Sequence, residues 1–163
     1  MTGNAPQRWK PVLAAAGAAL ALGVIGALVT ELGPWYYDLK KPPWQPPDWL
    51  FGPAWTLIFG LAALSGMLAW IHAPDARTRR RILCLFAING FLNVLWSTLF
   101  FRFHRPDFAL AEVVLLWLSI LALIVVLPST SRASSWLLVP YLAWVTFAAL
   151  LNLAIVRLNY PFA

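Results

Sequence analysis

Five long apolar runs, separated by polar or basic connectors, dominate the pattern of hydrophobic and polar positions along the chain. At a rise of about 1.5 Å per residue, each run is long enough to cross a hydrocarbon layer about 30 Å thick. Helix is the expected conformation, because an isolated strand would leave its backbone groups unpaired in lipid. The predicted spans are residues 11–30, 51–72, 82–101, 108–127 and 135–156.

Composition excludes a soluble domain. Of the 163 residues, 61% are hydrophobic and only 11% are charged, whereas a soluble domain usually carries about a quarter charged residues. A charge at the bilayer centre costs at least about 2.5 kcal/mol, which explains why the charges avoid the apolar runs. We therefore predict an all-α membrane protein, a five-transmembrane-helix bundle that forms a single domain over residues 1–163 in contact with membrane lipid.

The first apolar run also has features of a signal peptide, because Arg8 and Lys10 precede an alanine-rich stretch. It is longer than a usual signal-peptide core, however, and no clear cleavage site follows it. Small residues recur on one helical face, at Ala15, Ala19, Gly23 and Ala27. Such a face permits close helix packing, so we expect the run to belong to the bundle.

Basic residues gather in the connectors, and their distribution predicts an orientation. The formal net charge is +6, from 12 Lys and Arg against 6 Asp and Glu. Because these cations flank apolar runs, we interpret them as orienting helices and meeting anionic headgroups, and not as binding nucleic acid. The N-terminal side holds seven of them, including the Arg77–Arg81 cluster, and the other side holds five. The positive-inside rule therefore predicts a cytoplasmic N-terminus, and we expect the bacterial inner membrane.

The first connector, residues 31–52, is long and rich in proline and aromatic residues (ELGPWYYDLKKPPWQPPDWLFG). The prolines of this segment lack a backbone N–H donor and have a fixed φ, so the segment is not a continuous helix. Its rings are Trp35, Tyr36, Tyr37, Trp44 and Trp49. An aromatic belt at headgroup level is one interpretation of these rings. For the whole segment we predict an ordered lid over one mouth of the bundle.

Polar and indole side chains inside the runs point to a pocket beneath this loop. Alternating helix directions place Trp55, Asn93, Trp96, Glu112 and Asn152 in the half of the membrane nearest the loop, with Trp144 deeper. An amide- and indole-lined pocket is one interpretation of this clustering. Interhelical hydrogen bonds, worth about 0.6 kcal/mol on average, are the alternative for any single asparagine.

Glu112 lies just over one turn into the fourth run. A carboxylate there is able to bind a ligand or a proton, or to reach the surface and pair with Arg102 or Arg105. Its shallow position favours the surface pairing.

Motifs of enzymes and metal sites are absent. The chain has no Gly-rich phosphate loop, no clustered metal ligands and no serine or cysteine nucleophile motif, and its single cysteine, Cys84, forms no intrachain disulfide. We therefore predict no catalytic residue, no metal and no obligatory cofactor. A flat aromatic ligand with acidic arms would suit the lid, because indoles stack on its faces and Lys40, Lys41 or Arg105 pair with its carboxylates.

Three segments resemble the TspO/MBR family, which contains the tryptophan-rich sensory proteins and the translocator protein, or peripheral benzodiazepine receptor. They are WYYDLKKPPWQPPDWLFGPAW at 35–55, NVLWSTLFFRFHRP at 93–106 and VPYLAWVTFAALLNLAIVRLN at 139–159. Together they cover the chain from the end of the first run to residue 159. The resemblance implies a five-helix bundle, usually a homodimer in bacteria, with a pocket under the first loop that binds porphyrins such as protoporphyrin IX.

By motif position, the resemblance implies ligand-binding roles for residues of the loop and of three helices: Tyr36, Trp44, Trp55, Asn93, Trp96, Trp144, Ala148 and Asn152. Two departures limit what is carried over. Phe59 stands where many members have tyrosine, so a hydroxyl contact to ligand is missing there. Leu153 stands where animal members have the tyrosine of the cholesterol motif, so we predict no specific cholesterol recognition.

The resemblance predicts a receptor- or sensor-type membrane protein that binds porphyrin tetrapyrroles for sensing, sequestration or transport. One alternative is the light- and oxygen-dependent porphyrin degradation reported for some members, which here would rely on ligand photochemistry because no general acid or base is visible. Another is a small-molecule transporter, although the chain lacks an inverted repeat and deep charged residues. Some members have been placed in outer membranes, so the resemblance leaves that location open.

Overall fold

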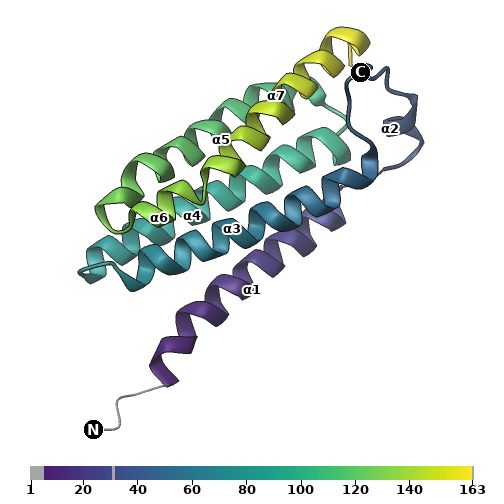
Figure 1. Ribbon diagram of the computed structural model, residues 1–163. Coiled ribbons are helices and arrows are strands. Elements are labelled where there is room, and N and C mark those ends of the chain that lie inside the picture. Colours follow the sequence, from purple (N-terminus) through teal and green to yellow (C-terminus); the bar gives the residue numbers. More distant parts are fainter. Residues whose placement is uncertain (1–5, 31, 163) are drawn as a thin grey trace, which may run out of the picture.

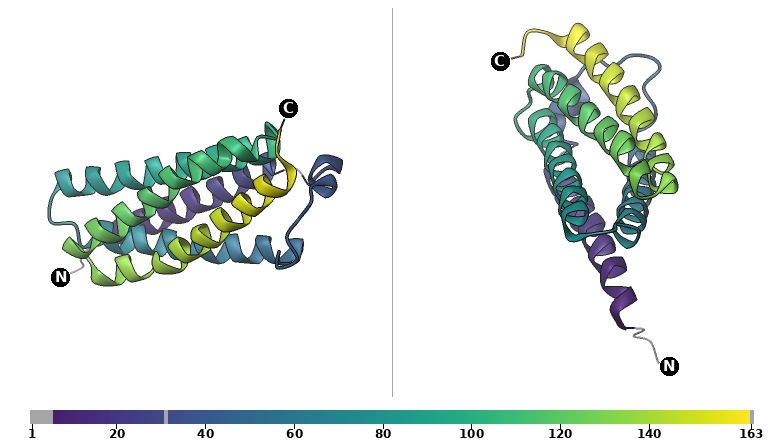
Figure 2. Two further views of the ribbon diagram at one scale, coloured as in Figure 1. Left: turned by 90° about the horizontal axis from the view of Figure 1, so that it is seen from above. Right: turned by 90° about the vertical axis from the view of Figure 1, so that its left-hand side faces the viewer.

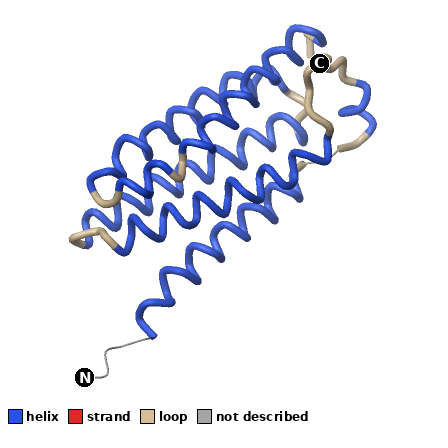
Figure 3. Tube along the Cα trace, viewed as in Figure 1, coloured by secondary structure: helices blue, strands red, loops and turns tan. Residues whose placement is uncertain are grey.

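The computed structural model describes residues 6–30 and 32–162, and every regular element among them is a helix (Figure 3). Five long helices form the bundle (Figure 1): α1 (Pro6–Val29), α3 (Phe51–Ile71), α4 (Ala76–Ser97), α5 (Pro106–Val126) and α7 (Val139–Asn159). The short elements are α2 (Pro34–Asp38), α6 (Arg132–Trp136), the 3-10 turns η1 (Asp48–Leu50) and η3 (Leu127–Ser129), and the π-helical turn η2 (Thr98–Arg102). The predicted five-helix all-α architecture is confirmed.

The long helices lie side by side and alternate in direction (Figure 2). α1 packs against α3 and α4, while α5 lies between α4 and α7. The loop that contains α2 lies at the same end of the bundle as the end of α7, and the α3–α4 turn lies at the opposite end (Figure 1). The connector between α1 and α3 is therefore placed to cover one mouth of the bundle.

The outer surface of the bundle is apolar. Four helical stretches are long and apolar enough to cross a membrane: Asp48–Ile71, Ala76–Arg102, Pro106–Ser129 and Arg132–Asn159. Within the described residues, α1 contributes a shorter apolar stretch, Ala15–Val29. Large apolar side chains remain exposed, such as Leu28 at 75% and Val125 at 69%, and lipid tails cover such a surface as readily as apolar neighbours do. The chain is an integral multi-pass membrane protein.

α4 begins at Ala76, before the predicted boundary at residue 82. The carboxylate of Asp75 accepts a hydrogen bond from the backbone N–H of Thr78 (2.7 Å) and caps the helix. The Arg77–Arg81 cluster is therefore helical and not part of a connector. Hydropathy marks where a helix enters lipid, whereas the cap determines where its hydrogen bonds begin, which explains the difference.

The fifth predicted span also starts elsewhere. α7 begins at Val139 instead of residue 135, and the separate short helix α6 precedes it. Pro140 stands at the start of α7 and has no backbone N–H, so a helix running on from α6 would lose a hydrogen bond at that point.

Replacing Asp75 with alanine is expected to accelerate amide hydrogen exchange in the first turn of α4, because the Thr78 N–H loses its acceptor. Asp75→Asn retains a side-chain oxygen and should exchange at close to the wild-type rate. The bonds to Thr78 hold the pKa of the Asp75 carboxyl below its ordinary value of 3.8. Its stabilising contribution is therefore present above that value and is lost as pH falls through the lowered pKa. Equal exchange rates for wild type and Asp75→Ala would contradict the assigned cap.

Among the described residues, buried side chains form two clusters, one along the middle of the bundle and one at the loop end. The first is centred on α5, where Leu116, Ile120 and Leu123 are almost fully buried. The second consists of Tyr36, Phe100, Ala109, Leu151 and Ile155. Because Tyr36 belongs to α2 and its partners to η2, α5 and α7, this cluster anchors the connecting loop on the bundle.

Candidate ligand-binding site

The loop between α1 and α3 is folded on itself by a partly buried hydrogen-bond network. The phenol of Tyr36 donates to Asp48 Oδ1 (2.8 Å), and Gln45 Nε2 lies 3.2 Å from both of these oxygens. Burial, and then the hydrogen bond to Asp48, raise the pKa of the Tyr36 phenol above its ordinary range. The phenol therefore remains a donor at physiological pH and holds α2 against η1.

Two further contacts fasten this loop to the bundle. Asn159, the last residue of α7, exchanges a pair of hydrogen bonds with the backbone of Lys40: its Oδ1 accepts from the N–H (2.8 Å) and its Nδ2 donates to the carbonyl (2.9 Å). The ring of Trp35 stacks on His104 with centroids 4.2 Å apart. The predicted ordered loop over the bundle mouth is confirmed.

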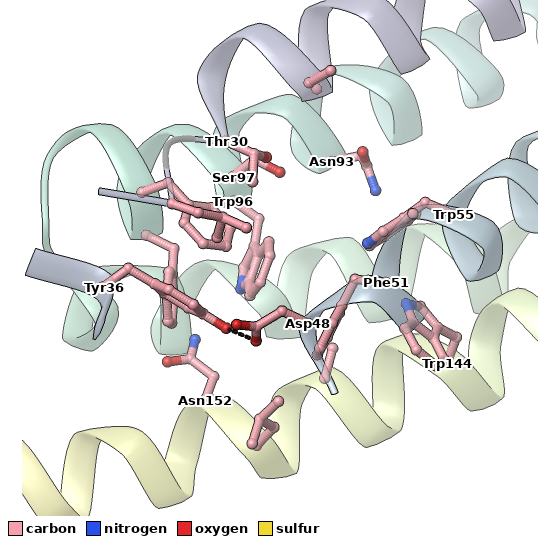
Figure 4. A pocket seen from close by; sticks show the side chains of 18 of the residues that line it. Thr30, Tyr36, Asp48, Phe51, Trp55, Asn93, Trp96, Ser97, Trp144 and Asn152 are labelled. Carbon is pink, nitrogen blue, oxygen red and sulfur yellow. Dashed lines mark hydrogen bonds between the residues drawn. The ribbon is translucent and has the colours of Figure 1, made fainter. Parts of the chain in front are cut away.

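A cavity of about 550 Å³ lies beneath the loop, and Figure 4 shows the side chains that line it. Its walls come from α1, α3, α4, η2 and α7, and its roof comes from the loop. Ligand pockets in proteins usually measure about 300–1,000 Å³ and are mostly apolar with a few polar groups. Size and lining both place this cavity in that class.

Of the eight residues implied as ligand contacts, seven line the cavity: Tyr36, Trp55, Asn93, Trp96, Trp144, Ala148 and Asn152. Figure 4 shows the six larger ones around a common space. The eighth, Trp44, does not line this cavity. It is 49% exposed and meets Phe147 edge-on, with centroids 5.9 Å apart, on the outer side of α7.

Three buried polar atoms in the cavity lining have no hydrogen-bond partner among the described residues. Two are indole nitrogens, Nε1 of Trp96 and Nε1 of Trp144, which are donors. The third is Oε1 of Gln45, an acceptor in the roof. A buried polar atom without a partner costs about 1–3 kcal/mol, but these three atoms are closed off from the cavity space, so an occupant reaches them only after a side-chain movement.

The asparagines of the site already have partners in other helices. Asn93 Nδ2 donates to the hydroxyl of Tyr141 (3.1 Å). With its amide oriented to satisfy both groups, Asn152 donates to the carbonyl of Pro106 (3.0 Å) and accepts from the N–H of Leu110 (3.1 Å). The interhelical interpretation of these residues therefore holds, and the same side chains also border the cavity.

The cations expected to pair with the carboxylates of a ligand lie outside the described cavity lining. Asp48 is the one charged residue among the described residues of the lining, and none of Lys40, Lys41 and Arg105 is among them. The ammonium of Lys41 lies over the Tyr36 ring, 3.6 Å from its centroid. Arg105 makes two hydrogen bonds, of 2.9 and 2.6 Å, to the carboxylate of Asp107. The described lining of the cavity is thus aromatic and nearly uncharged.

The expected surface pairing of Glu112 is wrong. Its side chain is only 6% exposed, and neither carboxylate oxygen has a hydrogen-bond partner among the described residues. Arg105 is bound to Asp107 instead, in the first turn of the same helix. Hydropathy gave the depth of Glu112 along α5 but not its rotation about the helix axis, and that rotation turns the side chain into the bundle.

α1 contributes a wall that the sequence interpretation did not assign to the site. Gly23, Gly26 and Ala27 line the cavity, although the small-residue face was predicted to serve helix packing. A Cβ added at Gly26 would meet no atom within 4 Å, so this glycine faces open space. Small residues in helical register serve close packing and leave room for a ligand equally well, so the pattern alone does not distinguish the two.

Comparison with known proteins identifies the family. Residues 15–158 match the model of the TspO/MBR family. The chain belongs to the TspO/MBR family. It is 41% identical to the tryptophan-rich protein TspO of Chlorobaculum tepidum, over 88% of this chain and 92% of that protein. It is 34% identical to the tryptophan-rich sensory protein of Cereibacter sphaeroides over 93% of both chains, and 31% identical to the human translocator protein over 77% and 75% of the two chains.

Two positions that depart from the usual TspO/MBR pattern lie on different surfaces. Phe59 lines the cavity and stacks on Trp55 with centroids 5.3 Å apart, so an aromatic face replaces a hydroxyl there. Leu153 faces a groove on the outside of α7, whereas Leu151 lines the cavity. In this chain, residues 151 and 153 therefore serve opposite faces of one helix.

Proposed function

We propose that this TspO/MBR member binds a porphyrin such as protoporphyrin IX in the cavity beneath the loop, and that binding serves sensing, sequestration or transport of tetrapyrroles. The aromatic-walled cavity of about 550 Å³ beneath the loop carries the proposal. A flat aromatic ring system suits such a lining, because the aromatic side chains of the cavity stack on its faces. Family membership supports the same ligand class.

The acidic arms of a porphyrin would have to leave the cavity at its loop end. The described lining offers them no cation, and Asp48 would repel them. The ammonium of Lys41 lies over the ring of Tyr36, which is part of the cavity lining. In this pose the macrocycle lies between Trp55 and Trp144 and its carboxylates point toward Lys41.

The names of two relatives agree with this range of roles. The Cereibacter sphaeroides relative is named a sensory protein, and the human relative is named a translocator protein. A sensor, a store and a carrier all need reversible binding, so the binding measurement comes first.

The proposal is tested by titrating the protein, held in lipid nanodiscs, with protoporphyrin IX while indole fluorescence is recorded. Four tryptophans line the cavity, so a bound porphyrin should quench a large part of the emission and saturate at one molecule per chain. Empty nanodiscs give the partition into lipid alone. Unsaturable uptake equal to that of empty nanodiscs would overturn the proposal.

Trp55→Ala and Trp144→Ala are each expected to weaken protoporphyrin binding at least tenfold, or about 1.4 kcal/mol, because each removes a stacking face from the cavity. Trp136→Ala is the matched control, since Trp136 lies on α6 and is 72% exposed. The same titration measures all three. Wild-type affinity in both cavity variants would remove this cavity from consideration as the porphyrin site.

Light-dependent porphyrin degradation is the second candidate, because the same four tryptophans lie in contact range of an occupant. The purified protein and protein-free porphyrin are illuminated equally in oxygenated buffer. A defined product that forms faster with protein would support the candidate, whereas equal bleaching would exclude it.

A further inference from the structure

A second concave surface lies outside the bundle, between the loop and α7. It measures about 750 Å³ and is lined from the loop by Lys41, Pro42, Pro43 and Trp44, and from α7 by Phe147, Leu150, Leu153, Ala154, Arg157 and Leu158. We call these residues the α7 groove. Among the described residues it shares none with the lining of the cavity beneath the loop, so it is a separate surface.

The groove runs along part of one lipid leaflet and has a charged end and an apolar end. Its α7 residues recur at helical spacing from Phe147 to Leu158 and form one stripe. Those 11 residue steps cover about 16 Å at 1.5 Å per residue, close to half of a hydrocarbon core about 30 Å thick. Leu150 is 56% exposed and Trp44 is 49% exposed, so the apolar wall is open to the membrane.

Cations stand at one end of this stripe. Among the described residues, Lys41 and Arg157 are the only charged side chains that line the groove, and no carboxylate lines it. Arg157 lies in the last turn of α7, at the end where the loop covers the bundle. Two cations above an apolar wall about 10 Å long, from Ala154 to Phe147, complement a phosphate headgroup with the upper part of an acyl chain below it.

We propose that the α7 groove is a binding site for an anionic phospholipid, with Lys41 and Arg157 on the headgroup and the apolar stripe between Ala154 and Phe147 along an acyl chain. The site selects by charge, because a zwitterionic headgroup carries a compensating cation. Since Trp44 and Lys41 belong to the loop, a bound lipid also holds the loop against α7. Arg157 and the apolar stripe belong to this site alone, whereas Lys41 also stands near the proposed porphyrin carboxylates, so the two ligands share that one cation.

The test compares phosphatidylglycerol with phosphatidylcholine by native mass spectrometry of the detergent-purified full chain. Each cation near an anionic headgroup strengthens attraction roughly fivefold, so wild type should prefer phosphatidylglycerol at least about fivefold. Arg157→Gln should reduce the preference, and Lys41→Gln with Arg157→Gln should abolish it. The control variant, Arg80→Gln with Arg81→Gln, removes the same amount of charge at the other end of the bundle. It should keep the preference for phosphatidylglycerol.

A neutral variant separates the groove from general charge effects. Ala154→Trp fills the groove without changing charge and should lower the retention of both lipids. Far-UV circular dichroism establishes that each variant keeps its helices. The proposal is overturned if wild type shows no headgroup preference, if the double groove variant keeps it, if the control pair loses it equally, or if inorganic phosphate in large excess displaces the lipid.

Discussion

Replacing Ala148 with tryptophan is expected to weaken saturable protoporphyrin binding by at least about 100-fold, or about 2.7 kcal/mol. Ala148 lines the cavity beside Trp144 and Asn152 on the same face of α7. An added indole occupies the space that the macrocycle needs, and the packed helices around it cannot move aside without strain. The fluorescence titration in nanodiscs measures the effect directly.

Ala143→Trp supplies the matched control on the same helix. Ala143 is exposed on the outside of the bundle, so an indole there enters lipid and leaves the cavity unchanged. Binding by this variant should equal that of wild type, with equal helical content in all three proteins. If the Ala148 variant saturates with unchanged affinity, the porphyrin lies elsewhere and the cavity has another occupant.

Asn152→Asp is expected to lower the free energy of unfolding by at least about 2 kcal/mol, because it places a charge without a partner in a buried site. The Asn152 side chain is 1% exposed and bridges Pro106 and Leu110 in the first turns of α5. A carboxylate keeps the bond from the Leu110 N–H but faces the Pro106 carbonyl with a second acceptor. Thermal unfolding in detergent, followed by circular dichroism, measures the loss.

Asn152→Leu separates the charge from the lost hydrogen bonds. Leucine has a similar size and removes both hydrogen bonds without adding charge. Asn152→Leu should therefore lower the free energy of unfolding less than Asn152→Asp does. Lowering the pH should restore part of the lost free energy of unfolding in Asn152→Asp and none of it in Asn152→Leu. Equal stability of wild type and Asn152→Asp at neutral pH would show that this amide does not bridge α5 and α7.

The number, order and lengths of the helices could be predicted from the sequence, because the thickness of the hydrocarbon layer sets the length of each apolar run. The ordered loop could be predicted as well, since its prolines exclude a continuous helix and its rings need burial. The family motifs then pointed to Trp55, Asn93 and Trp144, which the fold brings to one cavity. These features depend on composition, local chemistry and motif order alone.

Rotation of each helix about its own axis could not be predicted. A membrane helix is apolar on nearly all sides, so the usual amphipathic signal for the inward face is missing. For this reason the sequence did not reveal that Glu112 is buried or that Gly26 faces the cavity. The direction of the Trp44 side chain could not be predicted either. The prolines of the loop fix the local backbone direction, but they do not determine on which side a neighbouring ring lies.

The paired bonds between Asn159 and Lys40 join positions 119 residues apart. During synthesis the loop therefore emerges long before the residue that fastens it. Until α7 has been inserted to its last turn, the loop lacks the pair of hydrogen bonds to Asn159. A chain shortened before residue 159 would never form them. Fastening of the loop over the cavity is thus coupled to completion of α7.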